Sequence, residues 1–121
     1  MSVLARVVKY FALCEDVLAI GAMHVISPKK LKEFWQRHPD AEEPLRRWLT
    51  ITQHAAWQSL AETRQDFPHA DLAGDCTIFN VKGNSYRLIT IIFYPRQKAY
   101  VRFVLTHPEY DKGHWREDCR C

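Results

Sequence analysis

Glycine is scarce in this sequence, with four glycines among its 121 residues. The sequence contains no Walker phosphate-binding loop, no G-x-G-x-x-G dinucleotide motif and no H-E-x-x-H zinc motif. It also lacks the carboxylate cluster that holds paired metal ions in many hydrolases. These absences argue against the common nucleotide-dependent and metal-dependent enzyme classes. We therefore expect no metal and no cofactor, and any hydrolytic chemistry must come from the protein's own side chains.

Long hydrophobic runs are missing as well. Residues 1–22 are rich in apolar side chains, but Lys9, Glu15 and Asp16 interrupt them. The segment is therefore too broken for a transmembrane helix, and it lacks the continuous apolar region of a secretion signal. One interpretation is a helix with an apolar stripe. The interpretation we favour is an N-terminal extension from an upstream start, with Met23 as the true first residue.

The four cysteines are scattered along the chain, at Cys14, Cys76, Cys119 and Cys121. This spacing is not that of a disulfide framework, and no secretion signal precedes it, so a reducing cytoplasm is the expected location. The closing Cys-Arg-Cys lacks the paired C-x-x-C spacing of structural zinc sites. We expect residues 113–121 to form a flexible tail without a metal.

Acidic residues are absent from one long stretch. Between Cys76 and Leu105 every charged residue is basic, and these residues are Lys82, Arg87, Arg96, Lys98 and Arg102. The flanking segments mix both signs, as solvated surfaces usually do. Two interpretations stay open: a surface that faces phosphate groups, which we favour, or a chance cluster on an exposed face.

Length and hydrophobic patterning predict one α+β domain. Ser27 is the expected N-cap of the first helix and Asp40 the expected N-cap of the second. The expected elements are a strand at 24–26, helices to about 38 and from 40 to about 56, a helical turn at 59–65, and strands at about 76–82, 85–94 and 98–105. This order predicts two helices packed on one face of an antiparallel β-meander, with the other face free.

The first hairpin turn predicts which side chains share a face. With Gly83 and Asn84 as the two loop residues, Asn80 lies opposite Arg87 on the neighbouring strand. Cross-strand partners point to the same side of a sheet. We therefore expect Asn80, Lys82 and Arg87 to project together from the free face.

The second hairpin is expected to bring another arginine to that face. With a two-residue loop at 96–97, Arg87 lies opposite Thr106 and shares the free face with Arg102, with His107 at the rim. A three-residue loop would instead turn Arg102 toward the core. Burying an unpaired charge is costly, so the two-residue loop is the prediction.

Three side chains in this region have the chemistry to act on a phosphodiester. Arg87 interrupts an apolar strand and either pairs with Asp111 or Glu109 or clamps a phosphate through its planar fork of donors. His107 carries an imidazole, a side chain suited to proton transfer near neutral pH, with a structural role as the alternative. Tyr110 can orient or stack on a base.

Several segments together carry a family resemblance. They include Phe34-Trp35-Gln36-Arg37-His38-Pro39-Asp40, Phe67-Pro68-His69-Ala70-Asp71, Val81-Lys82-Gly83-Asn84-Ser85-Tyr86-Arg87 and Thr106-His107-Pro108-Glu109-Tyr110-Asp111-Lys112. With these segments the chain closely resembles the HigB toxins of bacterial type II toxin–antitoxin systems. The resemblance covers residues 23–112, the expected toxin domain, and excludes both ends of the chain.

The resemblance implies a RelE-like fold and an mRNA interferase that cleaves transcripts on the ribosome, neutralised by a HigA-type helix-turn-helix antitoxin. In RelE-like enzymes the substrate's own 2′-hydroxyl attacks the adjacent phosphate, and no metal takes part. The catalytic residues to which the resemblance points are Arg87, Arg102, His107 and Tyr110. The expected RNA-binding residues are Lys82, Asn80, Arg64 and Lys112.

Two alternatives to a nuclease remain open from the sequence. One is a growth-inhibitory toxin on the same scaffold that performs no chemistry, like the ParE toxins that poison DNA gyrase. The other is an RNA-binding module whose basic face never cleaves its ligand. Neither alternative needs a residue that transfers a proton.

Overall fold

The computed structural model describes residues 22–121, so the predicted N-terminal extension lies outside the described residues except for its last position. The elements, in chain order, are β1 (His24–Ile26), α3 (Lys29–Arg37), η1 (Pro39–Ala41), α4 (Glu42–Gln53), α5 (Leu60–Asp66), β2 (Asp71–Ala73), β3 (Cys76–Val81), β4 (Tyr86–Phe93), η2 (Tyr94–Arg96), β5 (Lys98–Thr106), α6 (His107–Lys112) and α7 (Trp115–Cys119). Within this part of the chain the strands form one sheet in the order β1-β5-β4-β3-β2. β1 runs parallel to β5, and the other neighbours are antiparallel. The α+β class and the β3–β4–β5 meander are confirmed, whereas β2, α6 and α7 are absent from the sequence-based prediction.

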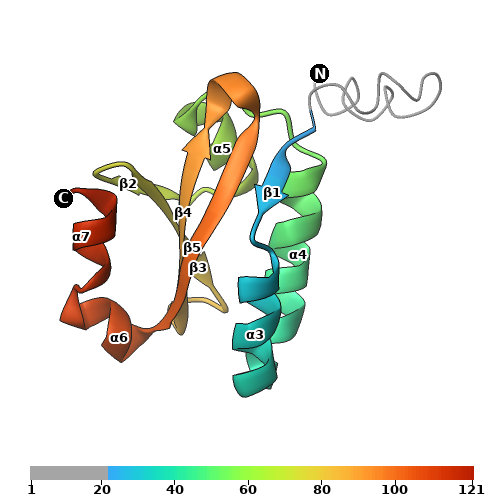
Figure 1. Cartoon of the computed structure of the whole chain (residues 1–121). Helices are drawn as coiled ribbons and strands as arrows, with labels where there is room; N and C mark the ends of the chain where they lie inside the picture. Colours follow the sequence, from blue (N-terminus) through green and yellow to red (C-terminus); the bar gives the residue numbers. More distant parts are fainter. Residues whose placement is uncertain (1–21) are drawn as a thin grey trace.

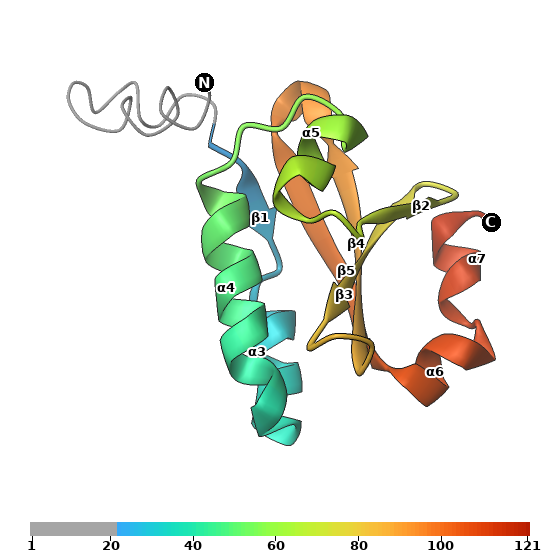
Figure 2. The ribbon, with the colours of Figure 1, turned by 180° about the vertical axis from the view of Figure 1, so that it is seen from behind.

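Helices α3 and α4 cover one face of the sheet, as Figures 1 and 2 show. Apolar side chains recur along both helices at helical spacing, and the buried ones include Leu31, Phe34, Leu45 and Trp48. The Trp48 ring meets Phe79 of β3 edge-on, with 5.5 Å between ring centroids. Burying each such side chain contributes roughly 1.5–3 kcal/mol. This layer therefore holds β3 and β4 in a fixed position for the residues on their other side.

The starts of these two helices differ from the prediction. Ser27 has a φ of 65°, and Pro28 takes the N-cap position of α3 without a side-chain cap bond. Ala41 is the N-cap of α4, because Pro39–Ala41 first makes a 3-10 turn. The predicted caps Ser27 and Asp40 are both wrong, and the Asp40 carboxylate instead bonds across to the sheet.

Asp40 ties the helical layer to the turn between β3 and β4. Its carboxylate accepts a hydrogen bond from the Tyr86 hydroxyl at 2.7 Å and pairs with the Lys82 ammonium at 3.2 Å. The prediction that Lys82 points with Asn80 and Arg87 is wrong, because Lys82 adopts a left-handed φ of 53° that turns its side chain toward Asp40. The predicted pairing of Asn80 with Arg87 is confirmed.

The bond between Asp40 and Tyr86 predicts how stability varies with pH. Hydrogen bonding from Tyr86, then from Lys82, lowers the pKa of Asp40 below its ordinary 3.8, and the bond to Asp40 raises the pKa of Tyr86 above its ordinary 10.0. The pair therefore stabilises the fold fully between these ordinary values. Its contribution is lost as pH falls through the lowered pKa of Asp40, and also as pH rises through the raised pKa of Tyr86.

We expect the free energy of unfolding of Tyr86→Phe to decrease less at high pH than that of the parent protein. We expect the free energy of unfolding of Asp40→Asn to decrease less at low pH. Denaturant titrations over a pH series would measure both effects. If the free energy of unfolding varied with pH in the same way in both variants and in the parent protein, this bond would not contribute to the pH dependence of stability.

The second hairpin has a longer loop than predicted. Residues 94–97, which begin with the 3-10 turn η2, form the loop in place of a two-residue turn. A β-bulge further along β5 leaves Arg102 without a partner on β4. Arg87 consequently lies opposite Leu105, and the predicted pairing with Thr106 is wrong.

The face of the sheet opposite α3 and α4 is partly covered. The chain returns over it through α6 and α7, as both views in Figures 1 and 2 show. Trp115 and Cys119 of α7 are buried in a second cluster with Cys76, Ile78 and Ile89 of the sheet. The expectations of a free face and of a flexible tail at its end are therefore wrong, because the apolar side of α7 buries itself against the strands.

A disulfide bond joins β3 to α7. It links Cys76 to Cys119 across 43 residues of sequence, and both residues are fully buried. The prediction that the cysteines are too scattered to pair is wrong, because the fold returns the C-terminal helix to the first long strand of the meander. Cys121 has an exposed free thiol two residues beyond this bond.

Candidate functional site

The guanidinium of Arg87 lies at the centre of the candidate site. It donates from Nη1 to the carbonyl oxygens of Asn84 at 3.1 Å and Tyr86 at 3.2 Å, and Nη2 lies 3.5 Å from the side-chain oxygen of Asn84. The same group sits 5.1 Å from the centroid of the Tyr110 ring. These partners are neutral, so they orient the guanidinium without cancelling its charge.

The alternative role for Arg87, an ion pair with Asp111 or Glu109, does not match these contacts. Glu109 accepts a hydrogen bond from the Thr106 backbone N–H at 2.9 Å, within the capping box that starts α6. Asp111 lies 3.1 Å from Nδ1 of His107. Both carboxylates thus bond locally, and the charge of Arg87 is available to a ligand.

His107 is the first residue of α6 rather than a loop residue. Its side chain is 48% exposed, and the Asp111 carboxylate one turn later contacts ring nitrogen Nδ1. A carboxylate at Nδ1 favours the tautomer that carries its proton there, which leaves Nε2 as a hydrogen-bond acceptor. The pair therefore has the arrangement of an oriented general base.

Tyr110 links Arg87 to the C-terminal helix. Its ring is stacked on Trp115, with 5.0 Å between centroids and 7° between ring planes. The indole N–H of Trp115 donates to the Tyr110 carbonyl at 2.9 Å. Because Trp115 is buried, Tyr110 rests on a fixed support and in turn supports the guanidinium of Arg87.

Arg102 is held by α7. Its Nε and Nη2 atoms each donate to the Asp118 carboxylate at 2.8 Å. The hydrogen bonds between them raise the pKa of Arg102 and lower the pKa of Asp118. Arg102 therefore points to the predicted side of the sheet, but Asp118 cancels its charge. The predicted catalytic role of Arg102 stays a prediction.

The predicted RNA-binding residues fall into two groups. Asn80 and Lys112 are exposed, and each lines a hollow on the surface. Arg64 donates to the Ala70 carbonyl at 2.8 Å and lies 3.5 Å from Asp71, so it fixes the segment between α5 and β2. Lys82 pairs with Asp40. The structure thus brings Asn80 close to Arg87, while acidic partners hold Arg64 and Lys82.

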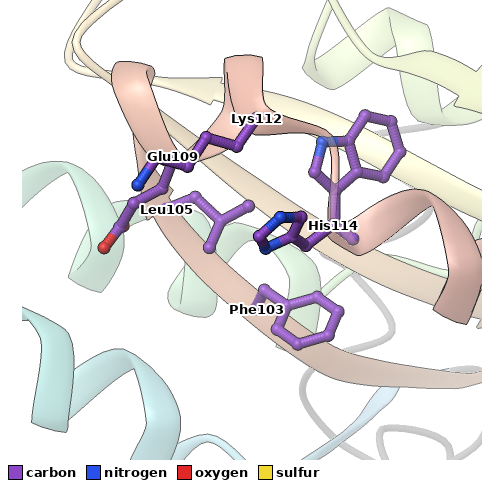
Figure 3. Close-up of a pocket in the computed structure, with 6 residues that line it drawn as sticks. Phe103, Leu105, Glu109, Lys112 and His114 are labelled. Carbon is purple, nitrogen blue, oxygen red and sulfur yellow. The ribbon is translucent and has the colours of Figure 1, made fainter.

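A cavity of about 340 Å³ lies between β5 and the C-terminal helices (Figure 3). Its lining residues are Phe103, Leu105, Glu109, Lys112, His114 and Trp115. In Figure 3 the side chains of Phe103 and Leu105 rise from β5 beside the ring of His114. Leu105 is the cross-strand partner of Arg87, so the cavity adjoins Arg87 on the same face of the sheet.

A second hollow lies on the other side of Arg87. Its volume is about 490 Å³, and its lining residues are His69, Asn80, Gly83 and Asn84. Neither His69 nor His114 was predicted as a catalytic or RNA-binding residue. The signal for His69 was available, because it lies within one of the segments that carry the family resemblance. His114 lies in the predicted tail, outside the resemblance.

Among residues 22–121, no group of three or more histidine, cysteine, aspartate or glutamate side chains is placed to hold a metal ion. No helix in this part of the chain combines the length and apolar content needed to cross a bilayer.

Residues 41–113 match the family profile HigB_toxin, described as a RelE-like toxic component of a toxin–antitoxin system. The mRNA interferase toxin HigB of Escherichia coli strain K12 is 30% identical over 92 residues, which cover 74% of this chain and 88% of that protein. The mRNA interferase HigB of Shigella flexneri gives the same values. The mRNA interferase HigB of Escherichia coli O6:H1 is 26% identical over 93 residues, which cover 74% of this chain and 90% of that protein.

The chain therefore belongs to the HigB toxin family. Its family match includes Arg87, His107 and Tyr110 but ends at residue 113, before α7 begins.

Proposed function

We propose that this toxin acts as an mRNA interferase that cleaves mRNA on the translating ribosome, in the bacterial cytoplasm. Membership of the HigB family implies an antitoxin partner and an RNA substrate. We assign the antitoxin to the HigA helix-turn-helix class. The relatives described above are named mRNA interferases, and an endoribonuclease activity is the function that the site supports best.

The observation that carries this proposal is the environment of Arg87. Its guanidinium is held by carbonyl and amide oxygens and by the Tyr110 ring, all of which are neutral. A guanidinium oriented in this way offers its remaining N–H groups to the oxygens of a phosphodiester. Preorganised donors stabilise the charge that develops on such oxygens in a transition state.

The reaction we propose needs only the RNA and the protein. The 2′-oxygen of one ribose attacks the adjacent phosphorus, and the bond from phosphorus to the 5′-oxygen of the next nucleotide breaks. Nε2 of His107 takes the proton of the 2′-hydroxyl, and the leaving 5′-oxygen gains a proton from solvent. Arg87 stabilises the pentacovalent phosphorane, and Tyr110 orients Arg87. The products are a 2′,3′-cyclic phosphate and a 5′-hydroxyl.

The cavity beside Arg87 fits a base of the RNA. Phe103, Leu105 and Trp115 give it apolar walls, and His114 adds a ring that can donate or accept a hydrogen bond. Lys112 at the same cavity is exposed and can contact a neighbouring phosphate. We assign Arg102 a different role from the predicted one: it positions α7 through Asp118 instead of touching the RNA.

Mapping of cleavage products on programmed ribosomes tests this function. We expect primer extension to show cuts at fixed positions within codons, with 5′-hydroxyl and 2′,3′-cyclic phosphate ends. An mRNA with a single 2′-deoxy nucleotide at the cut position should stay intact there, because the attacking hydroxyl is missing. Cleavage of that deoxy-substituted mRNA at the same position would contradict the proposed chemistry.

The same experiment separates the nuclease from its alternatives. Growth arrest without mRNA cuts, together with gyrase-linked DNA breaks, would support a gyrase poison. Binding of RNA without cuts or growth arrest would support a binding module.

A further inference from the structure

Helix α7 is too short to be stable without tertiary contacts. It spans Trp115–Cys119, and isolated helices of this length do not form in water. Its supports are the buried Trp115, the ion pair of Asp118 with Arg102 and the bond of Cys119 to Cys76. The disulfide is the one covalent support among them, and it sits at the last residue of the helix.

The end of α7 docks closely on the turn between β2 and β3. The Asp75 backbone N–H donates to the Cys119 carbonyl at 2.8 Å. A Cβ atom added to Gly74, whose φ is +60°, would lie 2.1 Å from that same carbonyl oxygen. This close approach places Cys119 against β3, where Cys76 follows two residues after Gly74.

Helix α7 supports the Arg87 guanidinium through Tyr110. Trp115 stacks on Tyr110, and Tyr110 lies under Arg87. Trp115 also lines the cavity beside Arg87, and Asp118 cancels the charge of Arg102. A displacement of α7 would therefore move the support of Arg87, open the cavity and free the charge of Arg102.

We propose that Cys76 and Cys119 form a reversible redox site that fixes α7 on the sheet and so controls the activity of the toxin. Disulfide bonds in cytoplasmic proteins are usually transient or redox-sensing rather than structural. The family match ends at residue 113, so Cys119 lies beyond it. The effect on activity rests on the proposed function, whereas the redox site itself rests on the fold.

The redox step is a thiol–disulfide exchange with a dithiol reductant. One thiolate of the reductant attacks the sulfur of Cys119, the bond to Cys76 breaks, and Cys76 leaves as a thiolate that takes up a proton. The second thiol of the reductant then breaks the mixed disulfide and releases Cys119 as a thiol, while the reductant becomes a disulfide. The bond is buried, so access requires local opening of the short helix α7.

In this proposal the oxidised protein is the more active form. The oxidised protein holds Trp115 under Tyr110, so the donors around Arg87 are preorganised for the phosphate. In the reduced protein only noncovalent contacts hold α7 on the sheet. The helix is then detached for part of the time, and Trp115 no longer supports Tyr110. Because misplacement of a positioning group slows catalysis steeply, we expect single-turnover cleavage to be roughly tenfold faster for the oxidised protein.

The test compares the purified toxin after oxidation with glutathione disulfide and after reduction with dithiothreitol. Three properties are measured: the number of thiols that react with a maleimide after unfolding, hydrogen exchange of the amides at 113–121, and single-turnover cleavage. We expect two fewer reactive thiols after oxidation than after reduction, because Cys76 and Cys119 are paired in the oxidised protein. We also expect faster exchange and slower cleavage in the reduced protein.

Two variants serve as matched controls. Cys121→Ser removes the exposed thiol but keeps the bond, and it should respond to oxidation as the parent protein does. The double variant Cys76→Ala, Cys119→Ala should show one slow cleavage rate under both conditions. The parent protein alone suffices for the test if the double variant fails to fold.

The outcomes distinguish this proposal from the proposed function. Failure of Cys76 and Cys119 to pair under glutathione disulfide overturns the redox site, as does unchanged exchange at 113–121 between the two states. Equal cleavage rates in both states overturn control of activity. If exchange changes with redox state but no RNA is cut in either state, the redox site stands and the proposed function fails.

Discussion

Replacing Arg87 by alanine is expected to lower the cleavage rate on programmed ribosomes by roughly 10²- to 10³-fold, the range found when one preorganised donor to a developing charge is removed. The reason is the loss of the guanidinium that Asn84, Tyr86 and Tyr110 hold in place. Growth arrest should be lost at equal abundance of the protein. Cleavage is measured under single-turnover conditions, because the rate then reports the chemical step and not product release.

The fold should survive this change. The side chain of Arg87 is half-buried, and its contact with Tyr110 is of a kind worth about 0.5–1 kcal/mol at exposed sites. Arg96→Ala is the matched control, because Arg96 is an exposed arginine in the loop after β4 and lies outside the site. Arg87→Lys keeps the charge but not the planar fork, and it should recover only part of the rate. A toxic, fully active Arg87→Ala protein would remove Arg87 from the mechanism.

Replacing His107 by alanine is expected to slow cleavage by roughly 10²-fold or more, the usual contribution of a positioned general base. Asp111→Asn should have a smaller effect, because Asp111 orients the ring through Nδ1 without touching the RNA.

The control for this prediction is His24→Ala, since His24 is an exposed histidine on the edge strand β1. The measurement is the single-turnover rate of all three variants on the same programmed ribosomes. An unchanged rate in His107→Ala would assign the proton transfer to another group. His69 would then be the next candidate, because it lines the hollow that includes Asn80 and Asn84.

The elements that depend on local sequence were predictable. Hydrophobic spacing predicted the two helices that the structure shows as α3 and α4, because helical periodicity can be read from neighbouring residues of the sequence. The tight turn at Gly83-Asn84 predicted that Asn80 lies opposite Arg87, since loop length fixes hairpin register. The roles of the site residues stay predictions, because they depend on a substrate as well as on the fold.

Features that depend on a single backbone conformation were harder to predict. The left-handed conformation of Lys82 reversed the direction of its side chain, and the bulge at Arg102 shifted the register of β5. Neither has a distinctive residue pattern, because lysine rarely adopts a left-handed conformation and no residue type in β5 marks the bulge. Tertiary contacts stabilise both features, through the ion pair of Lys82 with Asp40 and that of Arg102 with Asp118.

The sequence by itself determined the class of fold, the first hairpin and the family, because each rests on neighbouring residues or on a motif of fixed spacing. Only the tertiary structure decided that the C-terminal segment folds back as α6 and α7, that Cys76 meets Cys119, and that Asp118 cancels the charge of Arg102. These contacts join residues far apart in the chain. These contacts are stabilised by the burial of apolar surface that exists only once the sheet has formed. No local sequence pattern therefore predicts them.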